Sequence, residues 1–310
     1  MMNDLAHVYR ISVNECFESM WRVIAAIHAH PALEISSSWV DDPKKLAELE
    51  AGFVNDHFKR YKSFSWRGQV GAIDGIGINI LNPGVQVPKP KSSFVERKGH
   101  FMLLCIAICD VHRRFIYYDI SYESCTHDSL AWAGSPLGGR IHEALSAHKK
   151  GYFLNGDNAF VLSSTMIVPG GRDAFDFFQS SNRMAIECSF GVLIRRWGLF
   201  WRALSVKMNR RSGLIGAAMK LHNFCIVEKI SVPEYRVDKD GLSEINHEVW
   251  RKASNFGLDG EPNDYLDRHD ESRRRASTDR NAIRDELVKD LEEAGLKRPG
   301  TNSFHRQVTF

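Results

Sequence analysis

Three carboxylates in this chain, Asp74, Asp157 and Glu187, have the chemistry needed to hold divalent metal ions. Hard cations such as Mg²⁺ take oxygen ligands and keep several waters for a substrate. Two such ions, about 3.5–4 Å apart, can activate an attacking oxygen and stabilise a leaving oxygen. The three acids therefore predict two-metal hydrolysis of a phosphodiester, if the fold brings them to one place.

The neighbours of these acids favour a shared site. Asp74 lies in the apolar run GAIDGIGINI, where an uncompensated carboxylate would be costly to desolvate and a metal would remove that cost. Asp157 follows Gly156, which allows close approach, and Glu187 follows the apolar Ile186. Taken singly, each could also be a capping or surface acid, so the argument depends on their order along the chain.

The elements that must position the acids are strands and helices in alternation. Short apolar runs predict strands, and longer periodic segments predict helices. Asp74 falls in the first strand, Asp157 at the end of a later strand, and Glu187 in the helix that follows the last strand. This order indicates an α/β domain with a mixed sheet flanked by helices. The predicted strands are 71–80, 101–110, 115–121, 151–157 and 165–168, and the predicted helices are 128–148 (interrupted at Gly138 and Gly139), 183–204 and 212–227.

The segments on either side of this domain differ from it. Residues 1–65 read as a helical segment, with helices over 6–30 and 46–61, and Ser12 with Glu15 would form a capping box. We take 66–231 as the nuclease-like domain, with an exposed loop over 83–99. Residues 232–310 form a charged tail that we expect to be partly disordered, with one helix over 282–294.

Five short motifs in order give the core a resemblance to a known family. They are GAIDG at 71–75, THDS at 126–129, GD at 156–157 followed by VP, R-x-x-x-E-x-x-F-G at 183–191 followed by RRW, and LHNFC at 221–225. The chain resembles the DDE nucleases of Harbinger-type transposons and the nuclease derived from them. The resemblance implies an RNase H-like fold and cutting and strand transfer of DNA with Mg²⁺ or Mn²⁺, through two ions. By position, Asp74, Asp157 and Glu187 match the acidic triad, and Asp128 matches a further metal-associated acid.

Several features depart from the family or remain open. Asp128 precedes a predicted helix, so it could be an N-cap, a metal ligand, or both. The motif before THDS and the residues after Gly156-Asp157 and Pro169 differ from the usual family pattern, which affects the substrate loops and not the acids. The family carries a helix-turn-helix upstream of the nuclease, and here only its last part, about 11–27, is recognisable.

Basic residues near Glu187 predict contacts with DNA. The scissile backbone must meet the acids near this helix, so arginines and lysines here are placed to bind phosphates, with a solvated face as the alternative. Trp197, Phe200 and Trp201 have helical spacing and are interpreted as core. The predicted DNA-binding residues are Arg183, Arg195, Arg196, Arg202 and Lys207.

Composition limits the class of protein. The 310 residues carry a net charge of +3, with 27 basic and 21 acidic residues up to 231 and 14 against 17 beyond it. A mildly basic body suits a polyanion, although such asymmetry is common. There is neither a long apolar run nor a secretory signal, and the six cysteines form no C-x-x-C pair, which indicates reduced thiols and no membrane span. His127-Asp128-Ser129 are adjacent and cannot converge as a hydrolase triad.

The sequence leaves two possible functions for the chain. The first is a metal-dependent DNA endonuclease or transposase, favoured by the intact acids. The second is a non-catalytic DNA-binding or scaffold protein derived from a transposase, favoured by the short N-terminal segment. Both predict a nuclear location and DNA as a partner, and the family implies a Myb-like DNA-binding partner protein. The oligomeric state stays open, with a dimer as one option.

Overall fold

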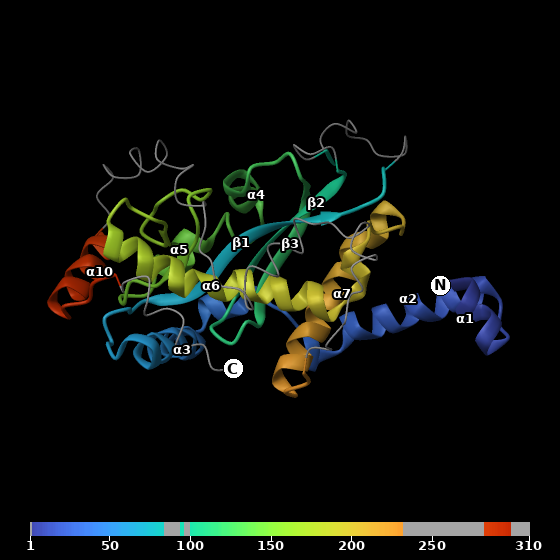
Figure 1. Cartoon of the computed structure of the whole chain (residues 1–310), viewed down its shortest axis with the longest axis horizontal. Helices are drawn as coiled ribbons and strands as arrows, with labels where there is room; N and C mark the ends of the chain where they lie inside the picture. The colour runs from blue at the N-terminus through green and yellow to red at the C-terminus, as the bar shows by residue number, and fades with distance from the viewer. Residues whose placement is uncertain (1, 84–93, 96–99, 232–281, 299–310) are drawn as a thin grey trace.

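A five-stranded mixed sheet forms the centre of the computed structural model, which describes residues 2–83, 94–95, 100–231 and 282–298 (Figure 1). The strand order is β3-β2-β1-β4-β5. The first three strands are antiparallel neighbours, whereas β4 and β5 run parallel to β1. This is the RNase H-like sheet that the sequence predicted. The strands are β1 (Gln69–Asn79), β2 (Met102–Cys109), β3 (Phe115–Glu123), β4 (Phe153–Asn155) and β5 (Met166–Ile167).

Successive side chains of a strand point to opposite faces of the sheet, and in this sheet both faces carry apolar side chains. Helices therefore cover both faces. One face carries α6 (Asp173–Arg196) and α7 (Met208–Val227), which pack on Ala72, Ile76 and Ile78 of β1. The other face buries Ile73 against α4 (Asp128–Gly134), α5 (Ile141–Ser146) and the start of α3 (Pro43–Tyr61). The outer strands β4 and β5 meet α10 (Ala282–Glu293) through a third apolar cluster. Figure 1 shows α6 lying across the sheet, with α10 near one end of it.

The helix that carries Glu187 is longer and lies earlier than predicted. It begins at Asp173, ten residues before the predicted start, and ends at Arg196, after which a short 3-10 helix covers Gly198–Trp201. The early start has two causes. Phe175 and Phe178 are buried against the outer strands, and Asp176 in the first turn accepts hydrogen bonds from the N–H groups of Gly170 and Gly171. The prediction of 183–204 was therefore wrong at both ends.

The N-terminal region is helical as predicted, but it forms two helices where we expected one. These are α1 (Met2–Tyr9) and α2 (Val13–Ala29), separated at Arg10, whose φ of 53° breaks the first helix. Ser12 caps α2, and its hydroxyl accepts the N–H of Glu15 at 3.1 Å. Both helices extend away from the sheet in Figure 1, and α2 packs on α7. Two short 3-10 helices, Pro31–Leu33 and Ser37–Asp41, lead into α3.

The other predicted strands and helices are present where the structure describes the chain, with small shifts in their bounds. The helix over 128–148 is divided into α4 and α5, as the two glycines suggested: a Cβ at Gly138 would stand 1.8 Å from the carbonyl oxygen of Trp132. All six cysteines are free thiols. Most of the predicted loop 83–99 and of the tail 232–310 lies outside the described residues, apart from α10 and its C-terminal extension to residue 298. Within the described part of the chain, no helix is both long and apolar enough to cross a membrane.

Candidate functional site

Asp74 lies in the middle of β1 on the face that α6 covers. Its neighbours on this face, Ala72 and Ile76, are buried in the same apolar cluster as Ile186 and Phe190 of α6. Asp74 itself keeps 17% of its side chain exposed. One of its carboxylate oxygens accepts the N–H of Gly75 at 2.9 Å. The acid therefore interrupts an apolar stripe at the point where α6 crosses the central strand.

Asp157 follows the end of β4, the parallel neighbour of the strand that carries Asp74. Ala72 of β1 is paired with Asn155 of the parallel strand β4. Asp74 lies two residues beyond Ala72, and Asp157 lies two residues beyond Asn155. Side chains two residues apart along a strand share a face, and both acids lie close enough to Arg183 to raise its pKa. Asp157 also accepts the N–H of Ala159 at 2.9 Å, which turns the chain away from the sheet.

The end of β4 is fixed to α6 by a buried amide. Gln179 is fully buried, and its Nε2 donates to the carbonyl oxygen of Gly156 and to the side chain of Asn155, both at 2.6 Å. Since Gly156 directly precedes Asp157, this amide sets the height of the acid relative to the helix. The sequence reasoning missed Gln179, although a glutamine within an aromatic run is a visible signal.

Glu187 lies on α6 and is joined to Asp74 through one arginine. Arg183, one helical turn earlier, places its Nη1 atom 2.5 Å from an oxygen of Glu187 and 3.6 Å from an oxygen of Asp74. The two carboxylate oxygens therefore lie within about 6 Å of each other, a spacing that a pair of ions about 3.5–4 Å apart could bridge. The structure thus brings Asp74 and Glu187 together.

The electrostatics of Arg183 connect it to all three acids. Burial opposes the charge on the guanidinium, but the attraction of Glu187, Asp74 and Asp157 is larger in sum and raises the pKa of Arg183. Only 15% of its side chain is exposed. Arg183, which the sequence predicted to be a DNA contact, is placed here as a shared cation of the acidic group.

Asp128 approaches the same strand from its other side. The N-cap of α4 is His127, whose ring nitrogen accepts the N–H of Ser129, so the interpretation of Asp128 as the N-cap was wrong. Asp128 stands in the first turn instead, and its carboxylate lies against Gly75: a Cβ at that glycine would be 2.8 Å from each of its oxygens. Since side chains alternate along a strand, position 75 faces away from the α6 side of β1.

The donor set suits a hard cation, although the side chains are not gathered around a single point. Four half-buried carboxylates, those of Asp74, Asp128, Asp157 and Glu187, provide only oxygen ligands, as Mg²⁺ and Mn²⁺ prefer. Among the residues that the structure describes, no three Asp, Glu, His or Cys side chains are close enough to hold one ion as they stand. Arg183 lies between two of the four acids, in contact with Glu187 and near Asp74.

The predicted DNA-binding residues separate into exposed and internal groups. Arg195, Arg202 and Lys207 are exposed near the junction of α6 and α7. Arg196 is buried, and its guanidinium donates to the carbonyl oxygens of Ile230 at 2.9 Å and Ser231 at 3.4 Å, beyond the end of α7. As predicted, Phe200 is core, whereas Trp197 and Trp201 are partly buried against it.

His222 and Asn223, for which the sequence offered no specific role, attach α7 to the start of β3. The amide of Asn223 accepts the N–H of Phe115 at 2.8 Å and donates to its carbonyl oxygen at 2.7 Å. His222 donates to the carbonyl oxygen of Arg113 at 2.9 Å. This part of the LHNFC motif is therefore explained by sheet anchoring.

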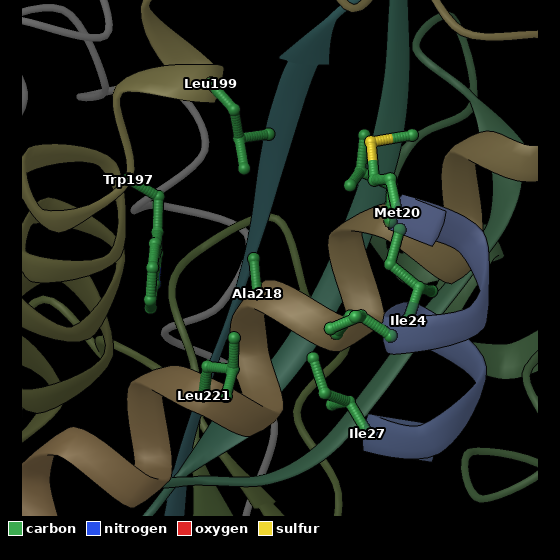
Figure 2. A pocket seen from close by; sticks show the side chains of 10 residues that line it. Met20, Ile24, Ile27, Trp197, Leu199, Ala218 and Leu221 are labelled. Atoms are coloured by element: carbon green, nitrogen blue, oxygen red, sulfur yellow. The ribbon is translucent and has the colours of Figure 1, made fainter. Parts of the chain in front are cut away.

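A separate cavity of about 300 Å³ lies between α2 and α7 (Figure 2). Its lining is apolar and contains no acidic residue, so we assign it to the packing of the N-terminal helices and not to the acidic group. Figure 2 shows Met20, Ile24 and Ile27 of α2 facing Ala218 and Leu221 of α7, with Trp197 and Leu199 beside them.

Comparison with known proteins relates the chain to nucleases. Residues 73–223, which contain all four acids, match the model of the DDE superfamily endonucleases. Over 240 residues the chain is 22% identical to the proteins named "Putative nuclease HARBI1" of Bos taurus and Homo sapiens, covering 74% of this chain. The chain spans 63% of the length of these curated relatives. No solved structure matches the chain.

Proposed function

Residues 73–223 match the DDE superfamily endonuclease family, and on that premise we propose that the chain is a divalent-metal-dependent DNA endonuclease of the DDE type. The observation that carries the proposal is the convergence of Asp74 from β1 and Glu187 from α6 on one guanidinium group. Carboxylates from a strand and a facing helix that meet at one cation can also meet at a metal ion.

In this proposal Asp74, Asp157 and Glu187 hold two Mg²⁺ or Mn²⁺ ions, and Asp128 assists from the other side of β1. Ions bound there would supply Lewis-acid activation of the attacking oxygen and neutralise charge on the leaving oxygen. The chain's own contribution is positioning. The sheet register pairs β4, which leads to Asp157, with β1, the Gln179 amide fixes the end of β4, and α6 brings Glu187 to the guanidinium that also contacts Asp74.

We propose that Arg195, Arg202 and Lys207 hold the DNA backbone. All three are exposed near the end of the helix that carries Glu187. Contacts to phosphates fix the register of a nucleic acid without reading its sequence, so we expect a target preference to come from a partner. A Myb-like DNA-binding protein, strand transfer after cutting, and action in the nucleus belong to the same proposal.

Cleavage of supercoiled plasmid by the purified chain tests the proposal. We expect nicking or linearisation with Mg²⁺ or Mn²⁺, none with a chelator, and none for Asp74→Asn in the presence of metal. Asp119→Asn is the matched control, because Asp119 is a buried strand carboxylate on β3, two strands from β1, and it accepts the hydroxyl of Ser121. A fully active Asp74→Asn variant would overturn the proposal.

The alternative is a non-catalytic DNA-binding or scaffold protein. The observation in its favour is that Arg183 already compensates Asp74 and Glu187 without a metal. Such a protein would bind DNA with a steep dependence on salt, since bound phosphates release counterions, but it would cut nothing at any metal concentration. The plasmid assay combined with a DNA-binding titration separates the two functions.

A further inference from the structure

Arg183 and a divalent cation would require the same oxygens. The arginine lies one helical turn before Glu187 and touches it at 2.5 Å, with an oxygen of Asp74 at 3.6 Å from the same nitrogen. Mg²⁺ and Mn²⁺ bind carboxylate oxygens at close range, and a positively charged guanidinium at hydrogen-bond distance from the same oxygen opposes their binding. The contact to Glu187 therefore competes with a metal for that oxygen.

The same contact explains how the acids stay together without a metal. Half-buried carboxylates repel each other, because the lower dielectric around them strengthens their interaction. One guanidinium offsets part of this repulsion, and its planar group can contact two carboxylates at once. Three acids with one arginine still carry a net charge of −2, so the group keeps an attraction for cations.

We propose that Arg183 is an internal counter-ion that occupies the ligands of the metal site and competes with the metal for them. The inference rests on the proposed function, because it assigns a metal to Asp74 and Glu187. Arg183 is then a positioning residue: it keeps the carboxylates in place and sets how much free metal the chain needs. An arginine with a structural role alone would not weaken metal binding.

Titration of the full-length chain with Mn²⁺ alone, followed by the electron paramagnetic resonance signal of the free ion, tests this competition. We expect Arg183→Gln to bind Mn²⁺ about ten-fold more tightly than the wild type. Arg183→Lys keeps the charge but lacks the planar fork, so its affinity should fall between the two. Arg140→Gln is the matched control: it removes an arginine that pairs with Asp41 at the surface, and its affinity should equal that of the wild type.

Thermal unfolding gives a second readout. Without metal, Arg183→Gln should unfold several degrees below the wild type, because the acids lose their cation, and saturating Mn²⁺ should restore more stability to it than to the wild type. If Arg183→Gln does not fold, Arg183→Lys is used for the test, because it too is expected to bind Mn²⁺ more tightly than the wild type.

The outcomes for the two proposals are distinct. Unchanged, weaker or undetectable Mn²⁺ binding by a folded Arg183 variant overturns the counter-ion role, even if the wild type cuts DNA. Tighter binding by the variants supports it, even if the wild type binds Mn²⁺ and cuts nothing, in which case the nuclease proposal fails alone.

Discussion

The carboxylate of Asp128 lies against the backbone of Gly75, so close that a Cβ on this glycine would stand 2.8 Å from both of its oxygens. Gly75 directly follows Asp74 on β1. The glycine therefore provides the space that lets an acid from α4 reach the central strand at the level of the acidic group.

Gly75→Ala should displace Asp128 and reduce both metal affinity and cleavage, with a cost to stability of about 1–3 kcal/mol from overpacking. Gly77→Ala is the control, since the Cβ there would meet the flexible side chain of Met102 at 2.7 Å, which can move. Mn²⁺ titration, plasmid cleavage and thermal unfolding compare the two. Equal activity of both variants would show that Asp128 needs no such space.

Asn223 is expected to stabilise the fold without taking part in chemistry. Asn223→Ala leaves the N–H and the carbonyl group of Phe115 without their partner, and we expect a loss of about 2–3 kcal/mol in the free energy of unfolding. Urea unfolding measures it. Asn55→Ala, on the exposed side of α3, should change the stability by less than about 0.5 kcal/mol. Similar values for the two variants would contradict the anchoring role.

Two buried histidines should make the fold sensitive to acid. Burial lowers the pKa of His57 and of His222 to about 4. The folded chain keeps both neutral while the unfolded chain binds protons below about pH 6.5, so stability is present above that pH and is lost as the pH falls toward 4. Between pH 7 and pH 5 we expect each histidine to lower the free energy of unfolding by about 2 kcal/mol.

Urea unfolding of His222→Gln at both pH values checks this assignment. The variant keeps a side-chain donor for the carbonyl oxygen of Arg113 but cannot titrate. Between pH 7 and pH 5 the variant should lose less stability than the wild type. The difference should equal the contribution of one histidine. An unchanged loss would mean that other groups dominate the acid response.

The adjacent arginines at the end of α6 should behave differently. Arg195→Ala should weaken DNA binding and reduce the salt dependence by about one phosphate contact, with stability preserved. Arg196→Ala should lower the unfolding temperature, because the carbonyl oxygens of Ile230 and Ser231 lose their donor. Binding titrations at several salt concentrations and thermal scans separate the two effects. The proposal for Arg195 fails if its replacement leaves DNA affinity unchanged.

The sequence predicted the sheet well because each central strand is an almost continuous apolar run between turn residues. Asp74 was proposed as a site residue for the same reason, since a carboxylate within such a run is conspicuous. The start of α6 was missed because its first turns are apolar on the side that meets β4, β5 and α10, and those contacts are not visible locally. Tertiary packing decided that boundary.

The role of Arg183 could not be inferred from its residue type. Its spacing from Glu187 is that of a helical ion pair, which was a usable signal. The contact with Asp74, however, depends on how α6 crosses β1, and a distance of 109 residues along the chain separates the two. Arg183 was therefore assigned to the substrate, whereas the structure pairs it with Asp74 and Glu187.

Because β4 is short, insertions and deletions should be tolerated at some positions near it and not at others. Only Phe153–Asn155 belong to the strand, and its pairing with β1 ends at Ala72. One residue gained or lost between 153 and 157 would turn Asp157 to the opposite face of the sheet, because side chains alternate. Residues added after Ala159, where the chain has already turned away, would leave that acid in place. Length variants of the domain should therefore cluster beyond this turn and spare the three-residue strand.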